Sequence, residues 1–337
     1  MVTSRDVARL AGVSQSTVSY VMSGRRSISP ETRRRVEAAI EELAFQPNAG
    51  ARALKSQRTQ VIGLVVPFGP GADTSGLLPF IETIANAARE QDHDVLLVTR
   101  DEGSAGLTRL ASRSLCDAIV LLDIEARDAR IPVAAALTVP VILIGLPEEP
   151  LGLPCVDMDF ELAGKLAVDH LAANHDRIVV IGHPPDIITR DLNFIRRFRS
   201  GTDAAARAHG LPYELHELPE RGPAGVIAAL DAAGRPRRGE RLGLVVPNTE
   251  AVQPVLNILT ERKLIPGHDV SVVGLCTDVL AESTTPPVTN VSLEPRDVSR
   301  RAMRTLFRLL DRDSSVPIDP VDLISPRLTR RQTTLAV

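Results

Sequence analysis

The sequence predicts two unlike parts: a small all-α head of the helix-turn-helix type and a larger α/β body of two doubly wound parallel sheets. The first 60 residues place apolar residues at helical spacing between capping residues, whereas the rest alternates short apolar runs with amphipathic segments. Residues 1–60 carry ten Lys/Arg and five Asp/Glu, a net charge of +5, and the whole chain carries −3, which leaves −8 for the remainder. The 337 residues also exceed what one compact core accommodates.

The first two predicted helices are short and flank a glycine turn. Thr3 is expected to cap the first helix, with Asp6 three residues later as a short capping box. Gly12 suits a left-handed turn, and Ser14 suits the N-cap of the second helix. The residues expected to face inward are Val7, Ala8, Leu10, Ala11, Val13, Val18, Val21 and Met22. Such a pair matches a helix-turn-helix, whose second helix enters the major groove of DNA; a helical hairpin on a protein surface is the alternative.

A third helix is expected from Ser29 to about Ala44. Ser29 is an N-cap residue followed by a proline at the first helical position, and Pro47 disfavours helix at the residue before it. A basic run lies near its start: Arg33, Arg34 and Arg35. A basic head on an acidic body is expected when only the head meets phosphates.

The head resembles that of the LacI/GalR (lactose-repressor) family of bacterial transcriptional regulators. The matching residues are Asp6-Val7-Ala8, Ala11-Gly12-Val13-Ser14, Thr17-Val18-Ser19 and Pro47-Asn48…Ala51-Arg52…Leu54. The resemblance implies these DNA contacts: Thr3, Ser14, Gln15, Ser16, Thr17, Ser19 and Tyr20 in the head, and Asn48, Ala51, Arg52, Leu54 and Lys55 in a hinge over residues 47–59. Gln15, Ser16 and Tyr20 then read base edges, and Gln15 suits a bidentate pair with adenine.

Leu54 is the centre of the implied hinge. In the family the hinge becomes helical only on DNA, and a leucine at this position wedges into a base step of the minor groove. Wedging of this kind kinks the duplex by roughly 20–90°. Arg52 and Lys55 are expected to hold phosphate beside it. The alternative for Leu54 is a core leucine of an ordinary linker helix.

The body follows a head of residues 1–46 and the hinge, and occupies residues 60–337. Buried strands are expected where short apolar runs end in turn residues: 61–67, 94–99, 118–122, 140–145, 155–159, 177–182, 242–246 and 269–274. The resemblance implies a two-lobed, periplasmic-binding-protein-like core. The chain is expected to pass from one lobe to the other near Asp159, Asn290 and Asp322. Lobe 1 is then about 60–159 plus 291–321, and lobe 2 about 160–290 plus 322–337.

A ligand is expected in the cleft between the lobes, at the carboxyl ends of the strands. The effector-binding candidates are Phe68, Asp123, Arg197, Asn248 and Asp278, with Asp73 and His183 as weaker ones. Arg197 is preferred within its arginine-rich segment, and Arg190 and Arg199 are expected on a solvated helix face.

The cleft departs from the family's sugar-binding pattern at three places. Phe198 stands where an arginine is usual, Cys276 and Thr277 replace a pair of aspartates, and Pro247-Asn248 replaces an Asn-Asp pair. Sugar hydroxyls are held best by carboxylate, amide and guanidinium groups. The alternatives are therefore a neutral sugar, a sugar phosphate or other metabolite, and either no small effector or a protein co-regulator.

The remaining features favour a regulator over other classes. Three cysteines are an odd number without metal-like spacing, so a reducing cytoplasm and no cofactor are expected. We find no catalytic motif, export signal or membrane-spanning run, which disfavours an enzyme, a solute-binding protein and a membrane partner. The expected function is a homodimeric repressor on a pseudo-palindromic double-stranded operator; an activator is the alternative.

Overall fold

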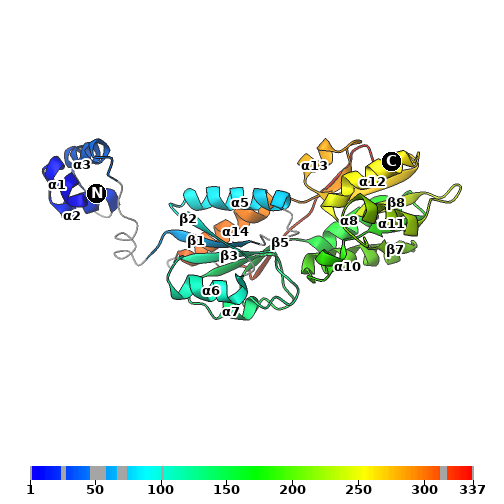
Figure 1. Ribbon diagram of the computed structural model, residues 1–337, viewed down its shortest axis with the longest axis horizontal. Coiled ribbons are helices and arrows are strands. Elements are labelled where there is room, and N and C mark those ends of the chain that lie inside the picture. The colour runs from blue at the N-terminus through cyan, green and yellow to red at the C-terminus, as the bar shows by residue number, and fades with distance from the viewer. Residues whose placement is uncertain are drawn as a thin grey trace. The chain divides into compact units, whose positions relative to one another are not determined.

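The computed structural model describes residues 2–23, 28–45, 58–66, 74–99, 102–311 and 317–335. It divides into a head, Met1–Gln60, and a body, Val61–Val337, which are described separately (Figure 1). Among the described residues, no helix combines the length and apolarity needed to cross a membrane.

The head consists of α1 (Ser4–Ala11), α2 (Gln15–Ser23) and α3 (Pro30–Glu42). Its core is one small cluster: Val7, Ala8, Ala11, Val18, Val21, Val36, Ala39 and Phe45, with Val13 packed against it. The inward orientation predicted for Leu10 and Met22 is wrong, because these side chains are 46% and 39% exposed. Helices this short bury only a narrow stripe on each other, and both residues lie at its margin.

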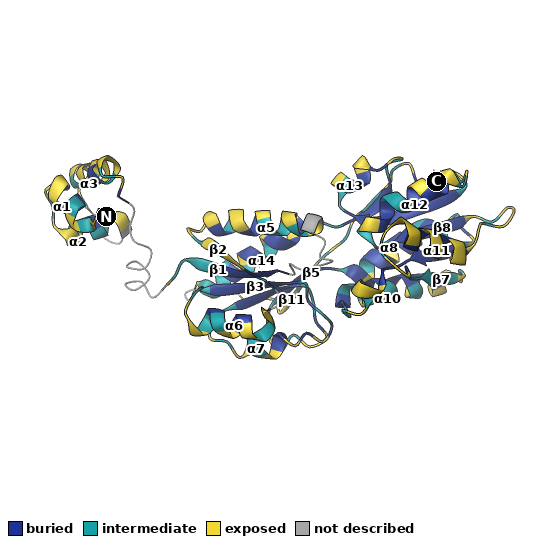
Figure 2. Cartoon of the chain, in the orientation of Figure 1, coloured by how far each residue is buried: buried dark blue, intermediate teal, exposed yellow. Residues whose placement is uncertain are grey.

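Lobe 1 of the body is a parallel sheet between two layers of helices. Its strand order is β11-β5-β4-β3-β1-β2. The strands are β1 (Val61–Val66), β2 (Asp94–Thr99), β3 (Ala118–Leu122), β4 (Val141–Ile144), β5 (Cys155–Met158) and β11 (Val321–Ile324). The helices α5 (Thr74–Arg89) and α14 (Pro295–Leu310) cover one face, and α6 (Gly103–Ser112) and α7 (Ile131–Ala135) cover the other (Figure 1). Burial on both faces explains why the inner strands β1, β3 and β4 are continuous apolar runs, whereas the edge strands β2 and β11 are largely exposed or half-buried (Figure 2).

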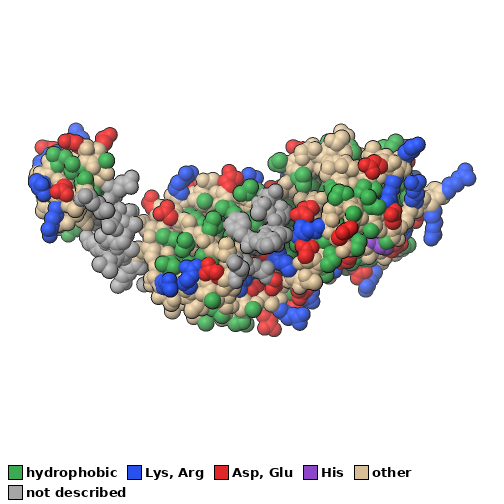
Figure 3. Space-filling model, in the orientation of Figure 1, with side chains coloured by type: hydrophobic (Ala, Val, Ile, Leu, Met, Phe, Trp, Pro, Cys, Tyr) green, Lys and Arg blue, Asp and Glu red, His purple; other side chains and the backbone are tan. Residues whose placement is uncertain are grey.

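Lobe 2 repeats the plan with strand order β12-β10-β9-β8-β6-β7. The strands are β6 (Arg177–Ile181), β7 (Tyr213–His216), β8 (Leu242–Val246), β9 (Val270–Cys276), β10 (Thr289–Ser292) and β12 (Leu328–Thr329), the last antiparallel to β10. Its helices are α8 (Phe160–Ala172), α9 (Pro185–Ile188), α10 (Asn193–Ala208), α11 (Pro223–Ala233), α12 (Val252–Glu261) and α13 (Asp278–Ser283), with a 3-10 turn at Thr249–Ala251. On the face drawn in Figure 3, acidic and basic side chains of the body are interspersed.

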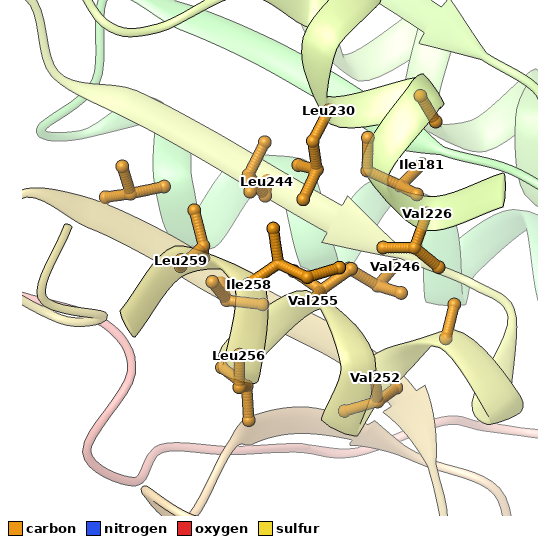
Figure 4. Close-up of a cluster of buried hydrophobic side chains, with 14 of the residues drawn as sticks. Ile181, Val226, Leu230, Leu244, Val246, Val252, Val255, Leu256, Ile258 and Leu259 are labelled. Carbon is orange, nitrogen blue, oxygen red and sulfur yellow. The ribbon is translucent and has the colours of Figure 1, made fainter. Parts of the chain in front are cut away.

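The cores of lobe 2 lie on the two faces of its sheet. One core joins α8 and α10 to the sheet, and the other joins α11 and α12 to it. Figure 4 shows the second core, in which Leu230 of α11 and Val255 of α12 meet Leu244 of β8. On the first face α8 and α10 pack backbone to backbone, since a Cβ on Gly201 would lie 1.9 Å from the carbonyl oxygen of Glu161.

The chain passes between the sheets three times. The first passage is at Asp159, and the later two follow the ends of β10 and β11. The predicted passages near Asn290 and Asp322 lie close to these strand ends, although Asn290 still pairs with Thr329 inside β10 and Asp322 with Val156 inside β11. Both strands are short and partly polar, so no apolar run marks their ends.

Candidate functional site

Local hydrogen bonds fix both helices of the candidate DNA-binding surface. The backbone nitrogen and hydroxyl of Thr3 donate to Asp6 Oδ2 at 3.0 and 2.7 Å, and these bonds lower the pKa of Asp6. Ser14 Oγ accepts the backbone N–H of Thr17 at 3.1 Å, and Gly12 adopts φ 62°. The predicted caps and the predicted left-handed glycine are confirmed.

The start of α2 presents the predicted base-reading residues. Ser14, Gln15 and Ser16 are exposed, while Thr17, Ser19 and Tyr20 are half-buried. Gln15 Nε2 donates to Ser4 Oγ at 2.7 Å, which orients the amide. An amide nitrogen carries two hydrogens, so one donor and the oxygen of Gln15 stay available for an adenine edge.

Arg35 of α3 has a role that the sequence did not indicate. Its Nε donates to the carbonyl of Ala11 at 3.1 Å, and its Nη2 donates to the carbonyl of Gly12 at 3.1 Å. Carbonyls at the end of a helix lack partners within it, and a cation there also suits the helix dipole. Arg35 thus clamps the turn between α1 and α2. Sequence alone does not separate Arg35 from Arg33 and Arg34, because reach between helices is a tertiary property.

Several predicted residues lie outside the described part of the chain. They are Asn48, Ala51, Arg52, Leu54 and Lys55 of the hinge, and Phe68 and Asp73 after β1. Their roles stay predictions.

A cavity of about 350 Å³ lies between the lobes of the body. It is lined by residues at the carboxyl ends of β3, β4, β5, β6, β8 and β9, which is where the doubly wound fold places ligands. The candidates Asp123, His183 and Asn248 line it, whereas Arg197 and Asp278 are not among the lining residues.

Arg197 and Asp278 serve other contacts. Arg197 Nη1 donates to Asp157 Oδ2 at 2.8 Å, and Nη2 donates to the carbonyl of Met158 at 3.1 Å, so Arg197 joins lobe 2 to lobe 1. Burial raises the pKa of Asp157 to about 6, and Arg197 limits the rise. Asp278 accepts from Ser292 Oγ at 2.6 Å and from Arg327 at 2.7 Å, which anchors the C-terminal segment.

Two further arginines join the lobes. Arg190 forms an ion pair with Asp123, and Arg196 forms one with Glu148. We call these two pairs and Arg197–Asp157 the interlobe ion pairs. Two hydrogen bonds beside them reinforce the contact. Asn193 Nδ2 donates to the carbonyl of Leu146 at 2.7 Å, and the backbone N–H of Ala126 donates to the carbonyl of Asp191 at 2.8 Å.

The solvated face predicted for Arg190 and Arg199 is wrong. Arg190 crosses to Asp123 of lobe 1, and Arg199 pairs with Glu217 within lobe 2. The acidic partners lie 67 and 18 residues away in the chain, so no local spacing could have revealed them.

His183 and Asn248 both line the cavity, and they differ in how their polar atoms are bonded. His183 is 6% exposed, and burial, with Arg199 nearby, lowers its pKa to about 4, so the ring is neutral near pH 7. Its Nδ1 is buried and has no hydrogen-bond partner among the described residues. Asn248 Oδ1 accepts the backbone N–H of Glu250 at 3.2 Å and so caps the 3-10 turn.

The aromatic and charged lining residues Phe80, Phe160, Phe194, Arg221 and Glu294 were not among the candidates, and Arg190 was expected on a solvated helix face. Phe160 and Glu294 each lie two residues after a strand, β5 and β10, so their positions at strand ends could have identified them. Within the described ranges, no group of three or more His, Cys, Asp or Glu residues is arranged to hold a metal ion. Burial raises the pKa of the Cys155 thiol to about 12, so this thiol is not a nucleophile.

Comparisons with known proteins agree with this architecture. The model of bacterial regulatory proteins of the lacI family matches residues 3–48, and that of periplasmic binding protein-like domains matches residues 168–334. Catabolite control protein A of Streptococcus mutans is 27% identical over 93% of this chain and 92% of its own. The HTH-type transcriptional regulator AscG of Escherichia coli is 29% identical over 100% and 99%. A lac repressor dimer bound to operator and an anti-inducer shares the fold, with TM-score 0.81, 23% identity and 99% coverage of both chains.

Proposed function

Because the chain belongs to the lacI family of DNA-binding transcriptional regulators, we propose that it acts as a homodimeric repressor on a pseudo-palindromic operator. In this proposal α2 enters the major groove, the hinge binds the minor groove, and a small molecule between the lobes controls both. The observation that carries the proposal is the start of α2, where an ordered cap leaves Ser14, Gln15 and Ser16 exposed together.

Control by a ligand is supported by where the cavity lies. A molecule bound between the lobes contacts both sheets, so its affinity depends on the angle between them. The interlobe ion pairs favour one arrangement of the lobes, and a ligand that fits another arrangement must break them. The lobe arrangement then sets the spacing of the two hinges in a dimer.

A dimer is supported by an apolar surface on lobe 1. Leu78 of α5 is 63% exposed and Leu97 of β2 is 47% exposed, and these two elements pack together. Exposed apolar side chains that gather in one place are typical of a surface that another subunit covers.

Operator selection with the purified full-length chain tests the proposal. We expect recovery of palindromic sites bound with an affinity that falls steeply with salt, because basic side chains displace counterions from phosphates. Absence of any selected sequence would refute a sequence-specific regulator.

The hinge is tested on the selected site. Leu54→Ala and Arg52→Ala are each expected to weaken binding by about tenfold or more, since they remove the wedge and a phosphate contact. Leu151→Ala is the matched control, because Leu151 is 53% exposed on the body. Normal operator affinity of the Leu54 variant would exclude the wedge.

A further inference from the structure

The walls of the interlobe cavity are strongly apolar and aromatic. Three of the seven phenylalanines of the chain line it, although aromatic residues make up only 3% of the sequence. The rings of Phe160 and Phe194 lie 5.0 Å apart, and Phe80 lines the cavity from α5. Walls of this kind favour a ligand with an aromatic or aliphatic body.

The cationic side chains of the cavity are already bound to carboxylates. Arg190 pairs with Asp123, and Arg221 donates to Asp186 at 2.7 Å and to Glu250 at 2.9 Å. An anionic ligand such as a sugar phosphate would have to displace these carboxylates. The described lining therefore disfavours an anion.

Among the described lining residues, Glu294 is the acidic side chain that has no cationic partner. It lines the cavity just before α14 and is half-buried. Within the described ranges its carboxylate forms no hydrogen bond or ion pair, and the nearby Arg296 and Arg327 are bound to Glu82 and Asp278. Burial, with Asp278 and Asp297 nearby, raises the pKa of Glu294, and a cation bound beside this carboxylate would offset the repulsion from the two aspartates.

Polar side chains at the carboxyl ends of the lobe 2 strands form hydrogen bonds within the protein. Thr249 Oγ1 donates to the carbonyl of Leu275 at 3.1 Å, Thr277 Oγ1 accepts from the N–H of Leu280 at 3.3 Å, and Asn248 is a cap. Within the described residues, the amide nitrogen of Asn248 and the hydroxyl hydrogen of Thr277 keep donor capacity for a ligand. His183, neutral and with Nδ1 unbonded, offers a single uncharged polar contact.

We propose that this cavity binds a small organic cation with an aromatic or aliphatic body, its ammonium group on Glu294 and its body against Phe160 and Phe194. The proposal rests on the proposed function, in which the cavity is the effector site. A charge-assisted hydrogen bond to the carboxylate then holds the ammonium group, and apolar contact with the rings holds the body. The ligand class differs from sugars and from sugar phosphates in charge and in hydroxyl content.

Three probes of similar size test the charge preference by calorimetric titration of the full-length chain: 2-phenylethylamine, 2-phenylethanol and 3-phenylpropionate. We expect the amine to bind about tenfold or more tightly than the alcohol, and the carboxylate to bind most weakly. Glucose and glucose 6-phosphate serve as sugar probes. Equal affinity for amine and alcohol, tighter binding of the carboxylate or of either sugar, or no binding of the amine would overturn the proposal.

Glu294→Gln locates the cation. We expect this variant to lose the preference for the amine while its affinity for the alcohol stays within about twofold. Glu261→Gln is the matched control, because Glu261 is exposed on α12 and does not line the cavity. An unchanged preference in folded Glu294→Gln protein, verified by circular dichroism, would contradict the assignment.

Operator binding by the same preparations separates this inference from the proposed function. Specific operator binding without an amine preference rejects the ligand class alone. An amine preference without specific operator binding supports the ligand class and rejects the regulator.

Discussion

Replacement of Arg197 by methionine tests whether the ion pair at the centre of the interlobe contact stabilises the body. The Arg197 and Asp157 side chains are 13% and 10% exposed, and their atoms lie 2.8 Å apart. Methionine retains much of the apolar volume but leaves a buried carboxylate without its cation. Removal of one partner of a buried pair typically costs about 3–5 kcal/mol.

The cost should depend on pH in a defined direction. The folded-state pKa of Asp157, about 6, lies above its ordinary value of 3.8, so the protonated carboxyl favours folding. This contribution is complete below pH 3.8 and is lost as pH rises through 6. Without Arg197 the pKa rises further and the loss continues to higher pH. We therefore expect Arg197→Met to cost about 1–2 kcal/mol at pH 5, from the lost bond to the Met158 carbonyl, and about 3–5 kcal/mol at pH 8.

Urea unfolding followed by circular dichroism at pH 5 and pH 8 measures both values. Asp157→Asn and the double variant complete a double-mutant cycle, in which the double variant should recover part of the loss at pH 8 because no charge stays buried. A loss below about 1 kcal/mol at pH 8, or equal losses at the two pH values, would refute the role of Asp157 as a buried charge that Arg197 compensates.

Two further substitutions probe local packing. Arg35→Met is expected to destabilise the head by about 1.5–3 kcal/mol, because the carbonyls at the end of α1 lose a charged donor. The melting midpoint of the head should fall relative to that of the control Arg33→Met. Equal midpoints of the two variants would contradict the role of Arg35 in holding the turn. Gly201→Ala should destabilise lobe 2 by about 2 kcal/mol or more, because its new Cβ meets the Glu161 carbonyl, whereas Ser200→Ala on the exposed face should be neutral in the same urea experiment. An unchanged free energy of unfolding for Gly201→Ala would show that α8 and α10 can move apart without loss of stability.

Short-range features of the head were predictable because they depend on residues within one turn of each other. Thr3 with Asp6, and Ser14 with Thr17, form bonds across three residues, and Gly12 was the residue best suited to positive φ. The direction of Leu10 was not predictable in this way, because it depends on which face α3 covers.

The positions of the predicted strand ends identified part of the cavity lining. Asp123, His183 and Asn248 follow buried strands, and parallel strands bring their carboxyl ends to one edge. Arg197 was preferred from its position in an arginine-rich segment. Its actual partner, Asp157, lies 40 residues earlier in the chain, in the other lobe.

The sequence by itself determined the two-part architecture, the helix caps and most buried strands, since capping residues and apolar periodicity act locally. Tertiary structure alone decided which charges meet. Arg190 pairs with Asp123, Arg35 binds the turn of the head, and Glu294 lines the cavity without an ion pair to any described residue. Ion pairs and cavity walls form between segments far apart in the chain, and their chemistry depends on distances that sequence spacing does not contain.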